Sequence, residues 1–505
     1  MTGTGALLVG LVLGGCGTTV PLSDRAEAGS LGTDGRSAGD LGAAEAGSGT
    51  SAAPGGSPSQ DVGAAQDPGA AAGAQGGAGT GSAGSDATSG QRSRSAPVPS
   101  GAITIGFVYL KNAQQQVSAV GAKNLVPDMR AGEEALVRDL NAHGGLNGHH
   151  VRPVFTPFNA TSSAPADEWQ RICTTFTQDS RVFAAVVPAI NDPSFSRCLS
   201  KGGVVEVSTL LTTEGQADFA AAPLLVEPAS FNLDRLAEIE PRQLVAQGWL
   251  SNRDDAGVGV DPKPKVGVVV FDKAGFREAY ERHLKPTLAG LGAPVADVEY
   301  VGDSAEALSS QMPNVVLRFA QDGINHVTFL TSTGLAPGLF LVHATQQQFK
   351  PRYGFSSQDA MGVVIEDLPD PKGQLHQSVL AGWFPQADVK DYNTPENAQP
   401  RQAACLALMR QNQVQESDGN SAGIDGYMCD SVWFLRDALR AGGAAVSTQS
   451  FMTGVDRLAG AYQPATTFAT FLSRARRDGA SQIRHASFAE QCTCFSYTSR
   501  GIRVS

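Results

Sequence analysis

Short apolar runs and amphipathic stretches alternate along the chain from residue 101 onward. Residues 103–110 (ITIGFVYL) predict a strand, and residues 129–141 predict a helix that ends at Gly144 and Gly145. Along that helix we expect a polar face with Glu133, Glu134 and Arg138 opposite an apolar face with Met129, Leu136, Val137 and Leu140. The same alternation predicts strands at 150–155, 182–190 and 203–209 and helices at 167–178 and 193–201. Successive βα units of this kind imply a parallel sheet with right-handed crossovers.

A second series of βα units follows. Its expected strands are 265–272, 295–300, 326–332 and 352–357, and its expected helices are 275–290, 304–321 and 337–348. Near-continuous Val and Ile in the strands suits sheets that are covered on both faces. A later strand at 379–384 and a helix at 430–441 suggest that the chain returns to its first lobe before it finishes in the second. We therefore expect an α/β protein with two Rossmann-like lobes and a hinge, the N-terminal lobe from 101–228 and 390–455 and the C-terminal lobe from 229–389 and 456–505.

The first hundred residues differ from the rest in composition. From residue 17 to residue 100 the chain consists mainly of Gly, Ala, Ser, Thr, Pro and Asp, and the first aromatic residue is Phe107. Such a segment cannot bury enough apolar surface to offset its ordering entropy. We interpret it as a flexible tether with a root-mean-square span of roughly 50 Å.

An apolar run at residues 6–13 is too short to span a bilayer but long enough for a secretion signal. It ends at Leu13-Gly14-Gly15-Cys16, which resembles the bacterial lipoprotein signal and implies lipidation of Cys16 and an extracytoplasmic chain held at the membrane. The alternative is an ordinary secretion signal that contains a cysteine. The opening MTGTG lacks the usual Lys or Arg, and a truncated start would account for that.

The seven cysteines also fit an extracytoplasmic protein. Six remain once Cys16 is set aside, an even number that can pair as disulfides, and disulfides persist outside the cytoplasm. Six cysteines allow fifteen pairings. Proximity in the sequence suggests the pairs Cys173 with Cys198, Cys405 with Cys429 and Cys492 with Cys494. The alternative for Cys492-Thr493-Cys494 is a metal-binding or redox role, which no CxxC or His partner supports.

Composition and motifs narrow the function classes. The chain is 41% hydrophobic and 17% charged, its formal net charge is −11, and it has no Lys/Arg-rich run. These values are typical of a soluble globular protein and do not favour nucleic-acid binding. No GxSxG elbow, HExxH pair, Walker loop or GxGxxG helix start is present, and His149-His150 fits a surface turn better than a metal site. We therefore expect no enzyme activity, cofactor or metal.

Four segments together resemble the type I periplasmic binding proteins, in particular the group related to branched-chain amino-acid and amide receptors. They are the strand at 103–110, the segment AGEEALVRDLNAHGGLNGHHV at 131–151, the segment KVGVVVFDKAGFREAYERHLKPTL at 265–288 and the segment DGYMCDSVWFLRDALRAGG at 425–443. The resemblance implies a monomeric binding protein that captures a small polar molecule between its lobes and delivers it to the permease subunits of an ABC importer. The alternatives are a ligand sensor that reports to a membrane receptor and a structural lipoprotein with a degenerate cleft.

The resemblance also places candidate ligand contacts at the carboxyl ends of the strands, where open α/β sheets bind ligands. In the first lobe they are Tyr109, Lys111, Asn112, Asn191, Asp192, Ser194, Thr209, Thr212 and Thr213. In the second lobe they are Asp272, Phe276, Ser332, Thr333, Ser356, Ser357 and Gln358. For each polar residue the alternative is a helix cap or turn, as Asp192 before Pro193 illustrates, and for Phe276 it is packing of the helix on its sheet.

The chain departs from the amino-acid receptor pattern at several of these positions. The family's Gly-x-x-Ser loop is Pro188-Ala189-Ile190-Asn191 here, and residues 228–232 lack the acidic residue expected to hold an ammonium group. The strand-end acid of the second lobe is replaced by Ser356-Ser357. Because a buried ammonium without a carboxylate is costly, the resemblance supports the fold and the binding role more than an α-amino-acid ligand.

Overall fold

A computed structural model describes residues 101–119, 126–188, 192–209, 213–255, 261, 263–332, 334–414 and 419–504. These residues all belong to one compact unit, which runs from Thr88 to Ser505. Cys16, the expected tether at 17–100 and three candidate ligand contacts, Asn191, Thr212 and Thr333, lie outside the described residues. No helix in the described part is both long enough and apolar enough to cross a bilayer.

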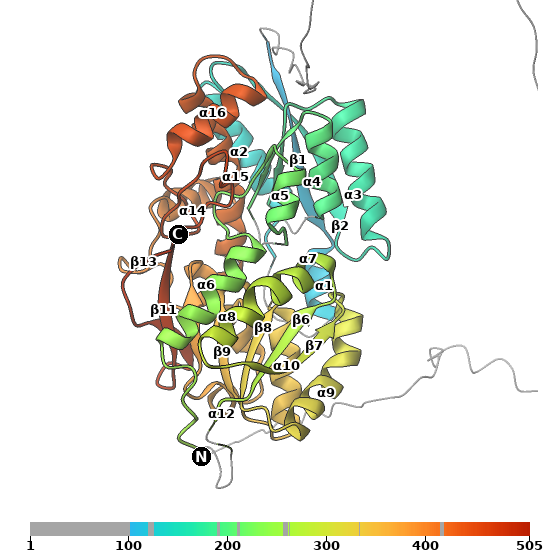
Figure 1. Ribbon diagram of the computed structural model, residues 1–505. Coiled ribbons are helices and arrows are strands. Elements are labelled where there is room, and N and C mark those ends of the chain that lie inside the picture. Colours follow the sequence, from blue (N-terminus) through green and yellow to red (C-terminus); the bar gives the residue numbers. More distant parts are fainter. Residues whose placement is uncertain are drawn as a thin grey trace, which may run out of the picture. The chain divides into compact units, whose positions relative to one another are not determined.

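The first lobe is built on a parallel sheet of five strands in the order β2-β1-β3-β4-β5 (Figure 1). The strands are β1 (Ile103–Lys111), β2 (Val151–Asn159), β3 (Ala184–Val187), β4 (Val205–Ser208) and β5 (Leu225–Val226). Its helices before the first crossover are α1 (Ala113–Ala119), α2 (Met129–Ala142), α3 (Pro165–Thr174), continued by a π-helical turn at Thr175–Asp179, α4 (Pro193–Lys201) and α5 (Gln216–Ala221). Residues of α3 and α4 pack on one face of the sheet, and α2 packs on the other.

The second lobe has a sheet in the order β12-β11-β10-β9-β8-β6-β7, with β13 paired to β11. Its parallel strands are β6 (Val266–Phe271), β7 (Val295–Val301), β8 (His326–Leu330), β9 (Arg352–Ser356) and β10 (Val379–Gly382). The helices that follow or flank them are α6 (Leu233–Ala246), α7 (Ala274–Ala279), η3 (Tyr280–Leu284), α8 (Lys285–Gly290), α9 (Ala305–Gln321), α10 (Leu335–Gln346), η4 (Ser357–Asp359), α11 (Met361–Val364), η5 (Ile365–Asp367), α12 (Pro371–Leu375) and α13 (Pro385–Asp388).

The far edge of this second sheet differs from the expected all-parallel arrangement. Strands β11 (Gln482–Ala489), β12 (Cys494–Tyr497) and β13 (Ile502–Arg503) pair antiparallel, and β11 joins the sheet antiparallel to β10. A hairpin needs only a short turn, so the last strands extend the sheet without another crossover helix. The second sheet is therefore mixed.

Before it forms that hairpin, the chain returns to the first lobe. Helices α14 (Gln402–Gln411), α15 (Gly419–Gly442) and α16 (Thr448–Leu458) contribute to the same core as β1, β3 and β4 (Figure 1). Tyr462 and Leu472 still pack in this core, so the passage back to the second lobe lies after the expected boundary at 455–456.

Local sequence accounts for where several helices begin. The Asp128 side chain accepts a hydrogen bond from the Ala131 N–H at the start of α2, and Ser304 caps α9 in the same way from the Ala307 N–H. One expectation for α2 is wrong: Glu133 is fully buried on the core side, and this burial raises the pKa of its carboxyl group well above the usual range. The periodicity placed Glu133 on the polar face, but helix α15 covers that side too.

The three predicted disulfides are present. Cys173–Cys198 joins α3 to α4, Cys405–Cys429 joins α14 to α15, and Cys492–Cys494 lies at the turn between β11 and β12. The first two are packed in the cores of the first lobe.

Candidate ligand-binding site

The carboxyl ends of the two sheets meet at the junction of the lobes. Gly275, in the first turn of α7 after β6, faces the segment after β4: a Cβ atom at Gly275 would lie 3.9 Å from the Thr213 carbonyl oxygen. The Leu233 N–H, at the start of α6, donates to the Glu214 carbonyl oxygen over 3.0 Å. Loops that follow parallel strands in both lobes therefore lie together, as the sequence predicts for a ligand site.

At the end of β1 the predicted side chains remain accessible. Lys111 and Asn112 are exposed, and Asn112, at φ 62°, donates to the Asn159 Oδ1 over 3.1 Å. The half-buried Tyr109 ring lies under the Arg130 guanidinium, 5.7 Å from ring centroid to Cζ. This corner combines two cationic groups with an aromatic face and an amide.

The other predicted contacts of the first lobe that the structure describes are engaged within the protein. The Asp192 carboxylate accepts from the Ser194 N–H over 2.8 Å and caps α4, while Ser194 is exposed. The Thr209 hydroxyl is buried and donates to the Tyr427 carbonyl oxygen over 2.7 Å, and the Thr213 hydroxyl donates to the Glu214 Oε2 over 2.9 Å. The cap and turn alternatives describe these contacts, so any role of these side chains toward a ligand stays a prediction.

In the second lobe, Asp272 is exposed and Phe276 is not. The Arg277 side chain donates to the Asp272 Oδ1 over 2.6 Å, and this hydrogen bond lowers the pKa of the Asp272 carboxyl group. Phe276 is only 1% exposed and packs edge to face on Phe271, with ring centroids 5.5 Å apart. Its expected place at the mouth of the site is wrong, because the ring packs α7 onto its sheet.

The residues after β8 and β9 are buried. Ser332 and Gln358 are 5% and 2% exposed. The Ser357 hydroxyl donates to the Asp388 Oδ2 over 2.9 Å and accepts from the N–H groups of Trp383 and Phe384. Ser357 therefore connects the end of β9 to the chain that leaves the second lobe.

Three buried carboxyl groups, which the sequence analysis missed, surround this connection. Burial raises the pKa of Glu240 to about 8 and that of Asp388 to about 7. Burial, and next the charge of Glu240, raise the pKa of Asp359 well above its usual range. The Thr328 hydroxyl donates to Glu240 over 2.8 Å, and the Tyr497 hydroxyl donates to Asp388 over 2.7 Å. Asp359 follows a predicted strand directly, so strand-end position was a usable signal for it, whereas Glu240 lies in a helix that the pattern did not predict.

The segments that pass between the lobes are bonded to one another. The Glu227 N–H donates to the Arg477 carbonyl oxygen over 2.8 Å, and the Gly479 N–H donates to the Glu227 carbonyl oxygen over 2.7 Å. The Arg235 guanidinium forms a short ion pair with Asp478, whose carboxylate also accepts from the Asn232 N–H over 3.1 Å. These contacts join residues 227–232 to residues 477–480 at the hinge.

A pair of acids ties the hinge to the loop after β4. The side chains of Glu214 and Glu227 are hydrogen-bonded and fully buried. Burial, followed by the negative charge of Glu214, raises the pKa of Glu227 well above its usual range. A hydrogen bond between two carboxyl groups needs a proton on one of them, so this pair shares a proton.

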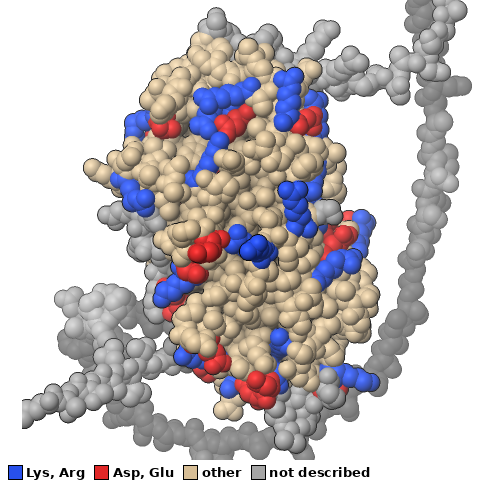
Figure 2. Space-filling model, turned by 90° about the vertical axis from the view of Figure 1, so that its left-hand side faces the viewer, with Lys and Arg blue, Asp and Glu red and all other residues tan. Residues whose placement is uncertain are grey.

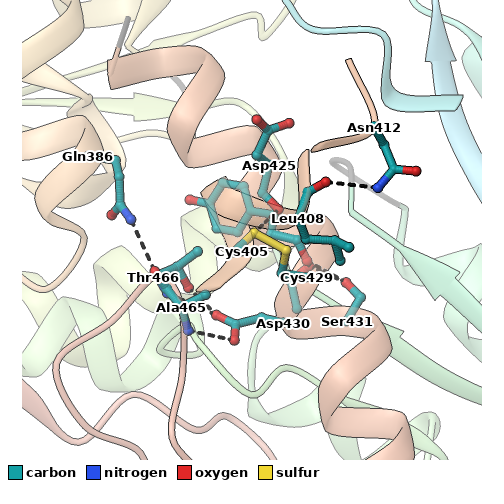
Figure 3. Close-up of a disulfide and its surroundings, with 12 residues drawn as sticks. Gln386, Cys405, Leu408, Asn412, Asp425, Cys429, Asp430, Ser431, Ala465 and Thr466 are labelled. Atoms are coloured by element: carbon teal, nitrogen blue, oxygen red, sulfur yellow. Dashed lines mark hydrogen bonds between the residues drawn. A yellow bond between two sulfur atoms is a disulfide. The ribbon is translucent and has the colours of Figure 1, made fainter. Parts of the chain in front are cut away.

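The third connection runs beside the Cys405–Cys429 disulfide (Figure 3). The Asp430 carboxylate, on α15, accepts from the N–H groups of Ala465 and Thr466 over 2.8 and 3.0 Å, and the Gln386 amide donates to the Ala465 carbonyl oxygen over 3.1 Å. The Phe384 ring lies 4.6 Å from the Tyr427 ring. Residues of the chain leaving the second lobe therefore contact both the first-lobe helix α15 and the returning chain.

A polar cavity of about 400 Å³ lies where α5, α6 and the α7–η3 helix come together. Its lining contains none of the predicted contacts; it consists of Gln216, Ala217, Asn232, Asp234, Arg235, Glu238, Glu278, Arg282 and His283. The His283 ring lies between Asp234 and Glu238, at 3.3 and 2.8 Å. This cavity opens beside the hinge, and its charges are balanced by neighbouring side chains.

The face on the side of α14, α16 and β11 is largely uncharged (Figure 2). Lys and Arg lie interspersed with Asp and Glu among other residues on this face. It therefore presents no extended field of one sign.

Neither a protein-family model nor a curated protein sequence matches the chain. Solved structures do match its fold. A solute-binding protein of an ABC transporter from R. palustris, in complex with 4-hydroxybenzoate, is 14% identical with a TM-score of 0.57, over 80% of this chain and 97% of that one. A branched-chain amino-acid ABC transporter structure from Thermus thermophilus with bound valine is 13% identical with a TM-score of 0.57, over 80% and 98%. A substrate-binding protein from Desulfitobacterium hafniense in complex with Leu is 14% identical with a TM-score of 0.52, over 78% and 99%.

These similarities define the class of structure. The described residues have the type I periplasmic-binding-protein fold, with two α/β lobes joined by a hinge, as the sequence resemblance predicts. At this level of identity the comparison concerns the fold alone.

Proposed function

We propose that this chain is an extracytoplasmic solute-binding protein that captures a small polar molecule between its lobes and delivers it to the permease subunits of an ABC importer. The observation that carries the proposal is the meeting of two sheets at their carboxyl ends beside a hinge, in the fold of proteins solved with 4-hydroxybenzoate, valine or leucine bound. We also propose that the protein acts as a monomer and has no enzyme activity.

The mechanism follows from the hinge. A ligand that touches both lobes binds the closed arrangement more tightly than the open one, so binding shifts the hinge equilibrium toward closure. Lys111, Asn112 and Tyr109 supply the first-lobe contacts in this proposal, because they lie together at the end of β1 and their side chains are accessible. Lipidation of Cys16 would hold the chain at the membrane, and residues 17–100 would let the lobes reach the importer.

The binding role is tested by a thermal-shift screen of the purified chain against amino acids, amides, hydroxybenzoates and sugars, with native mass spectrometry to detect a co-purified molecule. A true ligand at a hundredfold excess over its dissociation constant stabilises the fold by about 2.7 kcal/mol. We expect Lys111→Ala and Tyr109→Phe to weaken binding, while Lys201→Ala, an exposed lysine before the amino end of β4, leaves it unchanged. Failure of every compound to stabilise the chain, with no molecule co-purified, would contradict the proposal.

The anchor is tested separately. Cys16→Ser should move the protein from the membrane fraction to the soluble fraction and remove the mass of the lipid. A membrane fraction that is unchanged by this substitution would reject lipidation while leaving the binding role intact.

A further inference from the structure

The disulfide at the tip of the β11–β12 hairpin differs from the other two in exposure. Ala489 and Cys494 form the last pair of this ladder, and Cys492 lies in the turn beyond it. Cys492 is exposed and Cys494 is 7% exposed, whereas Cys173, Cys405 and Cys429 are at most 1% exposed and Cys198 is partly buried. Of the six paired cysteines, Cys492 is therefore the one that a reducing thiol in solution reaches most readily in the folded protein.

The three disulfides also differ in what they constrain. Cys173–Cys198 and Cys405–Cys429 span 25 and 24 residues, and Cys492–Cys494 spans 2. A cross-link restricts the unfolded chain in proportion to the logarithm of the loop that it closes. The hairpin disulfide therefore contributes little to the stability of the fold.

The residue between the two cysteines is held in an unfavourable conformation. Thr493 has φ 52°, a left-handed value that β-branched residues rarely adopt. The disulfide and the hydrogen bond from the Thr493 N–H to the Glu490 carbonyl oxygen, at 3.3 Å, both keep the turn closed around it. Opening the disulfide would let Thr493 relax, which favours the reduced state.

The two sulfur atoms are not equivalent toward an incoming thiol. The Cys494 Sγ lies 3.7 Å from the Ser496 Oγ, so the Ser496 hydroxyl can donate to a thiolate formed on Cys494. A better-stabilised thiolate leaves faster in exchange. Attack is therefore favoured at the exposed Cys492, with Cys494 as the leaving group.

We propose that Cys492–Cys494 is a thiol–disulfide exchange site that accepts electrons from a dithiol, either a small molecule or a protein. One thiolate of the dithiol attacks the Cys492 Sγ; the bond to Cys494 breaks, and its electron pair leaves on the Cys494 Sγ, which takes a proton from water. The second thiol of the partner loses its proton to water and attacks the partner sulfur that is bonded to Cys492, which releases the Cys492 thiolate, and this thiolate then takes up a proton. The partner is oxidised to a disulfide, and the protein gains two electrons and two protons.

The test uses the folded full-length chain with graded dithiothreitol in one arm and a reduced thioredoxin in the other. Free thiols are trapped with N-ethylmaleimide, and each cysteine is quantified by peptide mass spectrometry. We expect Cys492 and Cys494 to be labelled more than about tenfold faster than the four core cysteines, since exposed disulfides are the labile ones. Labelling in the dithiothreitol arm alone supports a small dithiol as the partner, and labelling in both arms supports a protein dithiol as well.

Two variants make the test specific. Thr493→Gly removes the conformational cost without touching a sulfur, so the disulfide should need more dithiothreitol to be half reduced. Ser496→Ala should slow the exchange. Labelling of all six cysteines at one rate, or labelling of Cys492 and Cys494 only after denaturant is added, would overturn the proposal.

Discussion

Glu240, Asp359 and Asp388 are ionisable side chains that the structure buries. All three are fully buried, at 1%, 0% and 0% exposure. The cost of removing a charge from water is met in part by hydrogen bonds from Thr328, Ser356 and Ser357, and in part by protonation. Stability should therefore depend on pH through these groups.

The first prediction concerns that dependence. Because the pKa values of Glu240 and Asp388 are raised to about 8 and about 7, their contribution is fully present below their unfolded pKa values, near 4, and is lost as pH rises through 7 and 8. We expect the free energy of unfolding to fall by at least roughly 3 kcal/mol between pH 5 and pH 8.5. Denaturant titrations at several pH values measure this. Glu240→Gln should flatten the curve and Glu306→Gln, at an exposed position on α9, should not; equal curves for both variants would reject the assignment.

A second prediction separates core from site. Phe276→Ala should lower the free energy of unfolding by about 3–5 kcal/mol, because it empties a packed ring position. Lys273→Ala, three residues earlier and exposed, should change it by less than about 0.5 kcal/mol. Thermal or chemical denaturation measures both values. If Phe276→Ala is as stable as the parent protein, Phe276 is not a core residue and is again a candidate ligand contact.

Strong hydrophobic periodicity was sufficient to predict some helices and strands, whereas tertiary packing determined the bounds of the others. Strands β6 and β8 lie within two residues of their predicted bounds. Helix α15 begins at Gly419, eleven residues before the expected 430, although GNSAGIDGYMC is poor in helix formers. Its first turns are helical because they pack against α13 and α11, and no local pattern reports such packing. Helix α6 was missed because Pro241 interrupts its pattern.

The same reasoning applies to the candidate site. Strand ends are predictable, and Lys111, Asp192 and Ser357 lie at or after the ends of β1, β3 and β9, while their role toward a ligand stays a prediction. Which of these side chains point outward depends on neighbours from other parts of the sequence. The Thr209 hydroxyl is directed inward to the carbonyl oxygen of Tyr427, and the Ser357 hydroxyl to the carboxylate of Asp388. The polar cavity at α5, α6 and η3 was not predictable, because its lining comes from three elements that meet only in the folded chain.

The third prediction belongs to the pair α14 and α15. Replacing Cys405 and Cys429 together by Ala should lower the free energy of unfolding by about 3 kcal/mol, since the disulfide closes a loop of this length in the unfolded chain. Replacing Cys492 and Cys494 by Ala should cost less than about half as much. Denaturation under non-reducing conditions gives both values, and equal losses would show that loop length does not govern them.

For the whole molecule, the hinge depends on charges that lie between the crossing segments. The side chains of Arg235 and Asp478 are 17% and 3% exposed, whereas those of Arg197 and Asp218, a pair within the first lobe, are 41% and 19% exposed. Loss of one partner leaves a buried charge uncompensated in the first pair only. The pair Arg235 and Asp478 is therefore more sensitive to the loss of one partner than the pair Arg197 and Asp218.

The fourth prediction follows from this difference. In Arg235→Ala, amide hydrogen exchange in residues 227–232 and 477–480 should accelerate by at least about tenfold, and the free energy of unfolding should fall by about 3 kcal/mol. Arg197→Ala should leave exchange in both segments unchanged. Hydrogen exchange followed by mass spectrometry reports on the two segments directly. Equal protection from exchange in both variants would show that the ion pair of Arg235 with Asp478 does not hold the two segments together.

The interleaved path of the chain has a consequence for its biosynthesis. The first lobe receives α14–α16 and residues as late as Leu472, and the second lobe receives β11 and β12 only after that. A polypeptide that has emerged as far as residue 400 has all five strands of the first sheet but lacks helices α14–α16, which cover β1 and β3, and β10 of the second sheet lacks its neighbour β11. Such incompletely covered sheets are prone to aggregate, and both lobes finish folding only when nearly the last residues of the chain are available.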